Sequence, residues 1–187
     1  MKGFILGVLA TVMVGAAIIY IYFDRGYAPV GTAAQAMPFE KRLARMALDA
    51  RVQKEAPHQV PIPTDEANFT AGAKIYVEHC AVCHGLPGKE QSAIAQGEFP
   101  KPPHLFKGKG VTDDPPGETY WKAANGTRMT GMPAFNKNLS PAELWEVSLL
   151  LANADKLPAS VMAILNNSEE PTGHSAGQSH EGTPHTH

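Results

Sequence analysis

The pattern Cys-Ala-Val-Cys-His at residues 80–84 limits what this chain can fold into more than any other stretch. Two cysteines separated by two residues and followed directly by a histidine form the attachment sequence for a c-type haem. The two thiols add to the two vinyl groups of the porphyrin, and the neighbouring imidazole reaches the iron as one axial ligand. Because the sequence contains no further cysteine, no other thiol competes for these roles. The motif therefore predicts one covalently attached haem c, held by Cys80, Cys83 and His84.

Three other uses of this cysteine pair remain open. A thioredoxin-like redox pair has the same spacing, but it accompanies a βαβ pattern that this sequence lacks. A structural zinc site needs four ligands, and His79 and His104 do not form a second pair at metal-ligand spacing. A disulfide between Cys80 and Cys83 would close a small, strained ring.

Composition excludes several classes of protein. Among 187 residues, 43% are hydrophobic and the formal net charge is −2, which lacks the basic excess of a nucleic-acid-binding protein and the charge excess of a disordered chain. Sixteen prolines and seventeen glycines predict many turns and extended connections. A domain of this size gains from an apolar cofactor at its centre, because it can bury little surface otherwise.

The N-terminal segment, residues 1–27, is predicted to be a membrane anchor. Residues 3–23 carry no charge and are long enough, at ~1.5 Å per residue, to cross a hydrocarbon layer of ~30 Å as a helix. Tyr20, Tyr22 and Tyr27 lie at its far end, where aromatic side chains favour the boundary between lipid and water. A cleaved signal peptide is the alternative, although its apolar core is usually shorter and the Ala-Gln-Ala at residues 34–36 lies well past the apolar run.

Two indications of orientation conflict. Only Lys2 and the amino terminus precede the span, whereas Arg25, Lys41, Arg42 and Arg45 follow it, which by the positive-inside rule favours a cytoplasmic C-terminal side. Haem is attached to proteins with this motif on the outer side of the bacterial cytoplasmic membrane. We give the motif more weight and expect a single-pass protein of the inner membrane with its haem domain on the periplasmic side.

Residues 28–63 are expected to form an amphipathic helix and a proline-rich linker. Phe39, Leu43, Met46 and Ala50 recur at the spacing of one helical face within residues 39–54. Such a helix packs on the domain or lies on the membrane; a docking helix for a partner subunit is the alternative. The prolines spaced through residues 57–63 forbid a helix there.

The folded module is predicted to cover residues 64–165. A helix runs from about Thr64 to the first cysteine, with Gly72 and Tyr76 on one face, and a short helix covers residues 118–125. Ser140 begins a further helix that extends to about residue 153, because a serine cap, a proline at the first position and a glutamate at the third form a capping box. Its apolar face is expected to cross the first helix at Gly72, where a small residue permits close approach.

The long segment between the cysteines and the second helix contains a candidate partner for the histidine. Within residues 85–117 there is little periodicity and much glycine and proline, which is expected of a segment wrapped around a rigid prosthetic group. A carbonyl in the stretch Pro-Pro-His-Leu at residues 102–105 can accept the Nδ1 proton of His84 and raise the basicity of the ring, and Pro103 is our candidate. The alternative is that these prolines only stiffen a loop.

Met132 is the predicted second axial ligand. A thioether is a soft, weak ligand suited to haem iron, Gly131 lets the backbone approach the porphyrin, and Pro133 stiffens the loop. Met129 is the competing candidate. Arg128 and Trp121 are further candidates for contacts with the haem propionates, or else surface residues with packed stems.

The last segment, residues 166–187, is rich in Ser, Gly, Pro and Glu and is predicted to be disordered. It contains His174, His180, His185 and His187 at irregular spacing. A solvated tail and a loose metal-binding tail are the two interpretations.

Together these elements resemble the class I cytochrome c family over roughly half of the chain. The resemblance is carried by the following residues: Gly72, Tyr76, the motif at residues 80–84, Pro103-His104-Leu105, the stretch from Thr130 to Phe135, and Trp145. It implies an all-α fold wrapping one haem c, preceded here by the transmembrane helix, with iron held by His84 and Met132. The sequence departs from the family at Leu149-Leu150, where many relatives have a tyrosine.

The resemblance implies one-electron transfer in a respiratory chain, not enzyme catalysis, with no nucleic acid and no small-molecule substrate as partner. An oxidase, a quinol-oxidising complex or a dehydrogenase is the expected redox partner. The alternatives are a haem-based sensor or enzyme with an open axial site, and a cytochrome subunit of a membrane dehydrogenase. Residues 64–158 hold nine Lys or Arg against eleven Asp or Glu, which does not predict steering by a strongly basic face.

Overall fold

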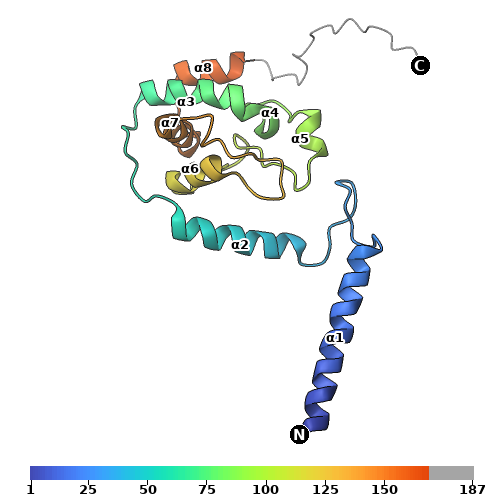
Figure 1. The fold of residues 1–187 in the computed structure, drawn as a ribbon. Helices are drawn as coiled ribbons and strands as arrows, with labels where there is room; N and C mark the ends of the chain where they lie inside the picture. Colours follow the sequence, from blue (N-terminus) through green and yellow to red (C-terminus); the bar gives the residue numbers. More distant parts are fainter. Residues whose placement is uncertain (169–187) are drawn as a thin grey trace, which may run out of the picture. The chain divides into compact units, whose positions relative to one another are not determined.

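The computed structural model describes residues 1–168, whose regular structure is entirely helical (Figure 1). Within these residues there is no strand, so the predicted all-α fold class is confirmed, and the βαβ context of a thioredoxin-like pair does not occur in this part of the chain. The helices are α1 Lys2–Asp24, α2 Glu40–Glu55, α3 Glu66–His79, α4 Ala81–His84, α5 Ala93–Gly97, α6 Pro116–Asn125, α7 Pro141–Ala152 and α8 Ala159–Asn167. By its contacts the chain divides into two compact units, Met1–Ala47 and the residues from Leu48 onward.

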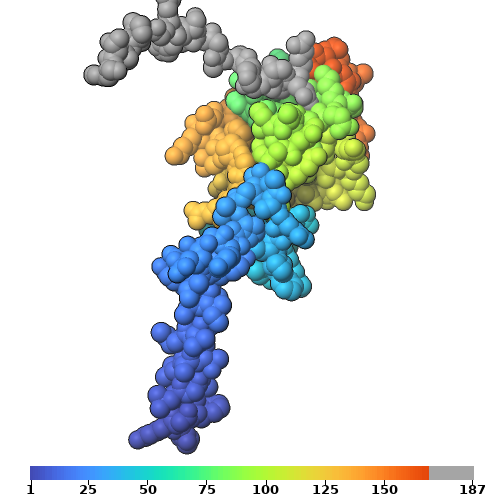
Figure 2. Space-filling model, turned by 90° about the vertical axis from the view of Figure 1, so that its right-hand side faces the viewer, coloured from blue at the N-terminus to red at the C-terminus, as the bar shows by residue number. Residues whose placement is uncertain are grey.

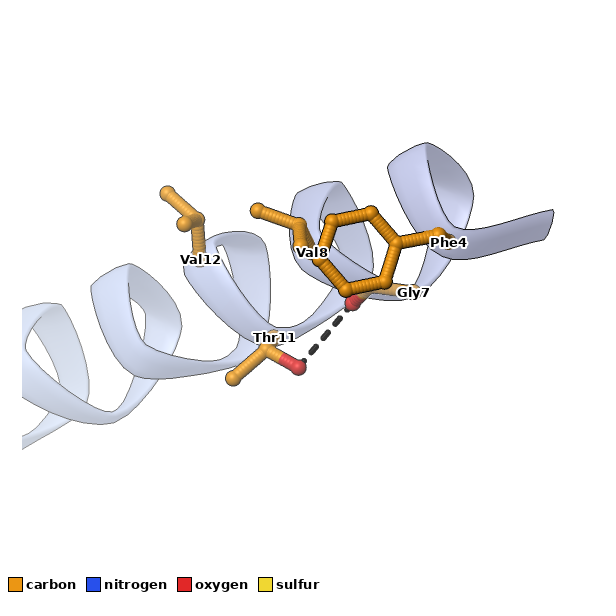
Figure 3. A pocket seen from close by; sticks show the side chains of 5 residues that line it. All are labelled: Phe4, Gly7, Val8, Thr11 and Val12. Atoms are coloured by element: carbon orange, nitrogen blue, oxygen red, sulfur yellow. Dashed lines mark hydrogen bonds between the residues drawn. The ribbon is translucent and has the colours of Figure 1, made fainter. Parts of the chain in front are cut away.

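Helix α1 has the length and composition of a membrane span. Its 23 residues carry no charge between Lys2 and Asp24 at the two ends, and none of them is buried within the structure. The hydroxyl of Thr11 donates to the carbonyl of Gly7 at 3.0 Å, so this polar side chain already has the partner it needs in hydrocarbon. Figure 3 shows Thr11 and Gly7 beside Phe4, Val8 and Val12, which line a shallow hollow on this single helix. An exposed groove on one helix encloses nothing, so it is not a cofactor site.

Helix α2 contains the boundary between the two units. Val52, in its second half, is 1% exposed, whereas the side chains of its first half lie open. Two contacts tie its C-terminal end to α6: the indole N–H of Trp121 donates to Glu55 at 3.2 Å, and the carbonyl of Pro57 lies against Gly117, where a Cβ would clash with it. Residues 48–63 therefore pack with the helical domain, although the sequence pattern suggested a module beginning near Thr64.

The crossing of α3 and α7 is the centre of the domain. Gly72 lies against the backbone of Glu146, where any Cβ would clash with the carbonyl group. The predicted crossing at this glycine is thus present, and the two helix axes approach more closely than larger side chains would permit. Leu149 and Leu150, at the positions where many relatives have a tyrosine, are 2% and 0% exposed and form part of the core.

Helices α6 and α8 complete the core around this pair. Helix α8 packs on α3 and contributes Val161 and Leu165, both fully buried, while α6 packs on α7. The ring of Tyr120 on α6 stacks on Trp145 of α7 with centroids 4.4 Å apart. Only a small part of the chain between α4 and α6 is helical, and in Figure 2 this segment, green to yellow-green, forms much of the visible surface of the domain.

Two helix boundaries can be compared with those expected from the sequence. The capping box is present at the start of α7: Ser140 accepts from the backbone N–H of Glu143 at 3.3 Å, and Glu143 accepts from the N–H of Ser140 at 2.7 Å. At the other end, Asn166 and Asn167 belong to α8, so the predicted start of the tail at residue 166 lies before the end of this helix. Polar residues can complete the last turn of a helix whose apolar side is packed. The rest of that predicted tail, residues 169–187, lies outside the described residues.

Replacing Gly72 by alanine is expected to lower the free energy of unfolding by about 1–3 kcal/mol, because the added Cβ must push α7 away from α3. Equilibrium unfolding in denaturant, followed by circular dichroism, measures this loss. The matched control is Gly97→Ala in α5, where nothing lies within 4 Å of the added Cβ and the change should be close to neutral. Equal effects of the two substitutions would contradict the role of the close crossing.

The capping carboxylate of Glu143 should give a pH-dependent contribution to stability. Its hydrogen bonds with Ser140 lower the pKa of Glu143 below the ordinary value of 4.5, so the contribution is complete above 4.5 and is lost as the pH falls through the lowered pKa. Wild type should therefore be more stable than Glu143→Gln at neutral pH, and the difference should vanish in acid. Glu146 provides the control of opposite sign, because burial raises its pKa and Glu146→Gln should cost nothing at neutral pH. Denaturant unfolding at several pH values measures both.

Candidate functional site

Cys80 joins α3 to the short helix α4, which carries Cys83 and His84. After α3 ends at His79, the N–H groups of Cys83 and His84 donate to the carbonyl of Cys80 at 3.1 and 2.9 Å. Gly85 then ends the turn with φ +75°, a conformation that favours glycine. The residue spacing thus becomes one helical turn that carries two thiols and an imidazole. Both cysteines are free thiols.

Tyr76 fixes the far end of this turn. Its side chain is 0% exposed, and its hydroxyl donates to the carbonyl of Gly85 at 2.7 Å. The ring of Phe106 packs edge-on against it, with centroids 5.0 Å apart. Sequence analysis assigned Tyr76 only to the packed face of its helix; its hydrogen bond to the end of the motif emerges from the structure.

His84 is oriented by the segment that follows α5. Its Nδ1 lies 2.8 Å from the carbonyl oxygen of Pro103, and its own carbonyl accepts from the N–H of Leu105 at 3.4 Å. Because a carbonyl can only accept, Nδ1 carries the proton and Nε2 has its lone pair free. Within residues 1–168, Nε2 makes no hydrogen bond. The hydrogen bond expected from the stretch at residues 102–105 is therefore present.

The titration of these groups favours their neutral forms. Burial raises the pKa of Cys80 to about 12, with a further contribution from Cys83. The pKa of Cys83 is raised to about 11, first by burial and then by the carboxylate of Glu98. Burial lowers the pKa of His84, against the opposing effect of the Pro103 carbonyl. Thiols with raised pKa values are poor nucleophiles at neutral pH, which disfavours thiol–disulfide exchange as their role.

Gln91 joins the motif to the segment that orients His84. Its buried side-chain amide donates to the carbonyls of Cys83 and Pro102, both at 2.9 Å. One side chain thus holds the turn with the thiols and the proline segment at a fixed separation. Sequence analysis did not identify Gln91, because a lone glutamine in an aperiodic segment gives no signal.

Glu98 lies against both predicted parts of the site. One oxygen of its carboxylate is 3.5 Å from the sulfur of Cys83, and the other lies where a Cβ on Gly131 would be. The loop that carries Met132 is therefore next to the turn that carries the thiols, although about fifty residues separate them in the sequence. Glu98 was also missed by sequence analysis, for the same reason as Gln91.

The loop with Met132 is closed on itself and fastened to α6. The N–H of Thr127 donates to the carbonyl of Met132 at 3.1 Å, and the hydroxyl of Thr127 lies 3.9 Å from the sulfur of Met132. Phe135 donates from its N–H to the carbonyl of Ala123 at 3.0 Å, which satisfies a carbonyl at the C-terminal end of α6. Gly126, with φ +66°, ends the helix where backbone atoms of Met132 and Pro133 leave no room for a Cβ.

The other candidate residues from the sequence, Met129, Trp121 and Arg128, have different surroundings. Met129 is 92% exposed, with φ +60°, so its side chain extends into solvent. The indole N–H of Trp121 is directed to Glu55 in α2, and Arg128 is exposed at the surface of the loop.

These residues fit the group that the motif predicts. The donor set is two neighbouring free thiols on one helical turn, an imidazole whose Nε2 is free, and a thioether on an adjoining loop. Within residues 1–168, no group of three or more His, Cys, Asp or Glu side chains can hold a metal ion, so this part of the chain offers no structural zinc site.

Residues 67–149 match the family model of cytochrome c oxidase, cbb3-type, subunit III. The domain is a class I c-type cytochrome. The match covers less than half of the chain and includes α4, α5, α6 and most of α3 and α7, so it describes this part of the domain and not α2, α8 or the N-terminal helix. The cofactor of a cytochrome domain of this kind is covalently bound haem c.

A solved chain of the reducing HAO-like protein complex of Kuenenia stuttgartiensis is similar to this one, with 29% sequence identity and a TM-score of 0.45. The similarity covers 52% of this chain and 48% of that chain, so the present chain spans about half the length of the solved one. No curated protein matches the sequence.

Replacing Gln91 by alanine is expected to cost about 1–3 kcal/mol of unfolding free energy, because two hydrogen bonds to the part-buried carbonyls of Cys83 and Pro102 are lost. Denaturant unfolding of the holoprotein measures the loss. Gln53→Ala, at an exposed position of α2, is the matched control and should change the unfolding free energy by no more than about 0.5 kcal/mol. A loss no larger at Gln91 than at Gln53 would contradict this role.

Proposed function

We propose that this protein is a membrane-anchored monohaem cytochrome c that carries single electrons between respiratory redox partners. Cys80 and Cys83 hold the porphyrin through thioether bonds, His84 and Met132 are the axial ligands, and the carbonyl of Pro103 orients the histidine. When bound, the haem supplies a reversible one-electron couple. The activity is electron transfer alone, without turnover of a small-molecule substrate.

One observation carries the proposed ligand pair: the carboxylate of Glu98 touches both Cys83 and Gly131. Two motifs that are distant in the sequence are thereby brought to one place, and the residue after Gly131 is Met132. Met129 lies on the same loop, but its side chain is exposed. The contact therefore favours Met132 over Met129 as the sixth ligand.

The surrounding residues fix the orientation of the proposed ligands in the protein itself. The hydrogen bond from Nδ1 of His84 to Pro103 fixes the tautomer and the plane of the ring, so Nε2 is presented as a neutral donor. The loop with Met132 is short and closed by the hydrogen bond between Thr127 and Met132. A site whose ligands are held in place needs little rearrangement between the two oxidation states, which suits rapid electron transfer.

The neutral ligands also bear on the redox potential. Imidazole and thioether add no negative charge to the iron, and a buried porphyrin stabilises the less charged ferrous state. Both features place the potential on the higher side of the range for haem proteins. The carboxylate of Glu98 beside Cys83 acts in the opposite direction, because a negative charge favours the ferric state.

Helix α1 supplies the proposed anchorage as an uncleaved, single-pass span. We place the cytochrome domain on the periplasmic side of the bacterial inner membrane, because haem is attached to such motifs outside the cytoplasm. The cations that follow α1 count against this orientation, and the chemistry of haem attachment outweighs them. Anchorage raises the local concentration of a redox partner in the same membrane, so a strongly charged docking face is not required.

The partner is proposed only as a class. The description of the matched family, a subunit of a cbb3-type cytochrome c oxidase, favours an oxidase over a quinol-oxidising complex or a dehydrogenase. A second function, a sensor or enzyme with an open axial site, requires that Met132 is not a ligand.

The Met132→Ala holoprotein tests the ligand assignment. Its ferric spectrum is expected to lose the methionine–iron charge-transfer band at the red end, its ferrous form should bind carbon monoxide, and its potential should fall. Optical spectra and redox titration measure these changes in the full-length, detergent-solubilised protein.

Met129→Ala is the matched control, because Met129 lies on the same loop and is exposed, and it should leave the band and the potential unchanged. If Met132→Ala keeps the charge-transfer band, the assignment of Met132 is wrong and another methionine is the ligand. If the wild-type ferrous protein binds carbon monoxide, its axial site is open and the electron-carrier proposal is wrong. Wild-type pigment should also resist extraction by acidified acetone, because thioether bonds hold it.

A further inference from the structure

An apolar row lies exposed at the beginning of α2. Phe39, Leu43 and Met46 are 70%, 63% and 58% exposed, and each is three or four residues from the next. At about 100° per residue, Leu43 and Met46 lie on one face of the helix, and Phe39 directly precedes the helix with φ +66°. Single exposed apolar residues are common on soluble proteins, but three large ones in a row on a short helix call for a partner.

The packed face of α2 is the opposite one. Val52 follows Leu43 by nine residues, which places it about half a turn away around the helix axis. It is 1% exposed, and Leu48, on the same side, is half-buried. The helix therefore already has a face that packs within the protein, and the apolar row does not serve that packing.

The charges near the row fit an anionic surface. The first two turns of α2 carry Lys41, Arg42 and Arg45 against the single acid Glu40. Arg42 lies about 70° around the helix axis from the centre of the row, whereas Arg45 and Lys41 lie farther round, on the polar side of the helix. An apolar row with a cation-rich polar side is the pattern of an interfacial helix, which lies in the headgroup region of a bilayer. Basic residues close to anionic lipid strengthen such binding.

The position of α2 in the chain brings it to a bilayer. Only residues 25–39 separate α2 from the candidate span α1, so even a fully extended connection is limited to about 50 Å. A membrane surface is thus present near α2 in every anchored molecule, whereas a second copy or a partner subunit would have to be recruited.

We propose that α2 lies on the surface of the bilayer that α1 spans, with Phe39, Leu43 and Met46 inserted below the headgroups and Arg42, which flanks the row, at the lipid phosphates. This inference rests on the proposed membrane anchorage. It gives the anchor a second point of attachment, next to the part of α2 that packs with the cytochrome domain, and so limits how far that domain can move from the membrane.

The two cysteines of the chain allow a sharp test. Both are consumed by the thioether bonds in the holoprotein, so a cysteine introduced elsewhere is the only free thiol and can be spin-labelled. The variants are Leu43→Cys and Met46→Cys on the apolar row, with Ala44→Cys as the matched control, because Ala44 is exposed and lies about 130° away from the centre of the row. Full-length holoprotein is placed in nanodiscs of phosphatidylcholine and phosphatidylglycerol.

Accessibility of each label to oxygen, which partitions into lipid, and to a water-soluble nickel chelate reports its surroundings. Labels at positions 43 and 46 are expected to collide several-fold more with oxygen than with the chelate, and the label at position 44 should show the reverse. Replacing phosphatidylglycerol by phosphatidylcholine should reduce this contrast, because the cations then lose their anionic partners.

Each other outcome overturns the proposal in a distinguishable way. If labels at 43 and 46 are as accessible to the chelate as the label at 44, the helix lies in water. If they are immobilised and shielded from both reagents, a protein surface covers the row. Co-migration of the holoprotein with the nanodiscs is measured first; its absence would refute the anchorage itself, whereas co-migration with water-exposed labels refutes only the interfacial helix.

Discussion

The contact between Gly72 of α3 and the backbone of Glu146 in α7 sets the geometry on which the site depends. Helix α3 leads directly into the turn with the two thiols and His84, and α7 begins a few residues after the loop with Met132. The crossing therefore determines how the two motifs stand with respect to each other. A glycine makes the separation of the helices depend on backbone atoms, which cannot adjust as side chains can.

Around this crossing, the site is assembled by hydrogen bonds to backbone carbonyls. Tyr76 donates to Gly85, Gln91 to Cys83 and Pro102, and His84 to Pro103. In a segment with little regular structure, buried carbonyls have no helix or sheet to satisfy them, so side chains must do so. The same bonds that stabilise the irregular segment also hold the imidazole in one orientation. Stability and cofactor binding are thus served by one set of contacts.

Much of this could be predicted from the sequence because the signals were local. Three features could be recognised from neighbouring residues alone: the capping box at Ser140, the helix before the first cysteine, and the glycine at the crossing. Each is present in the structure. Gln91 and Glu98 were not predictable, because their roles depend on partners brought close only by the tertiary fold. The predicted start of the C-terminal tail, residue 166, lies within α8, since polar Asn166 and Asn167 gave no sign of a helix.

By itself, the sequence predicted the cofactor, because two thiols and an adjacent imidazole at this spacing form the attachment sequence of haem c. It also determined an apolar N-terminal segment long enough to cross a membrane. Only the tertiary structure separates the two candidate methionines, since Met129 is 92% exposed whereas Met132 is half-buried and its sulfur lies near the hydroxyl of Thr127. The tertiary structure also decided which side of α2 is buried: Val52 is buried and Leu43 is exposed. Periodicity identifies the faces of a helix, but what each face contacts depends on residues far away in the chain.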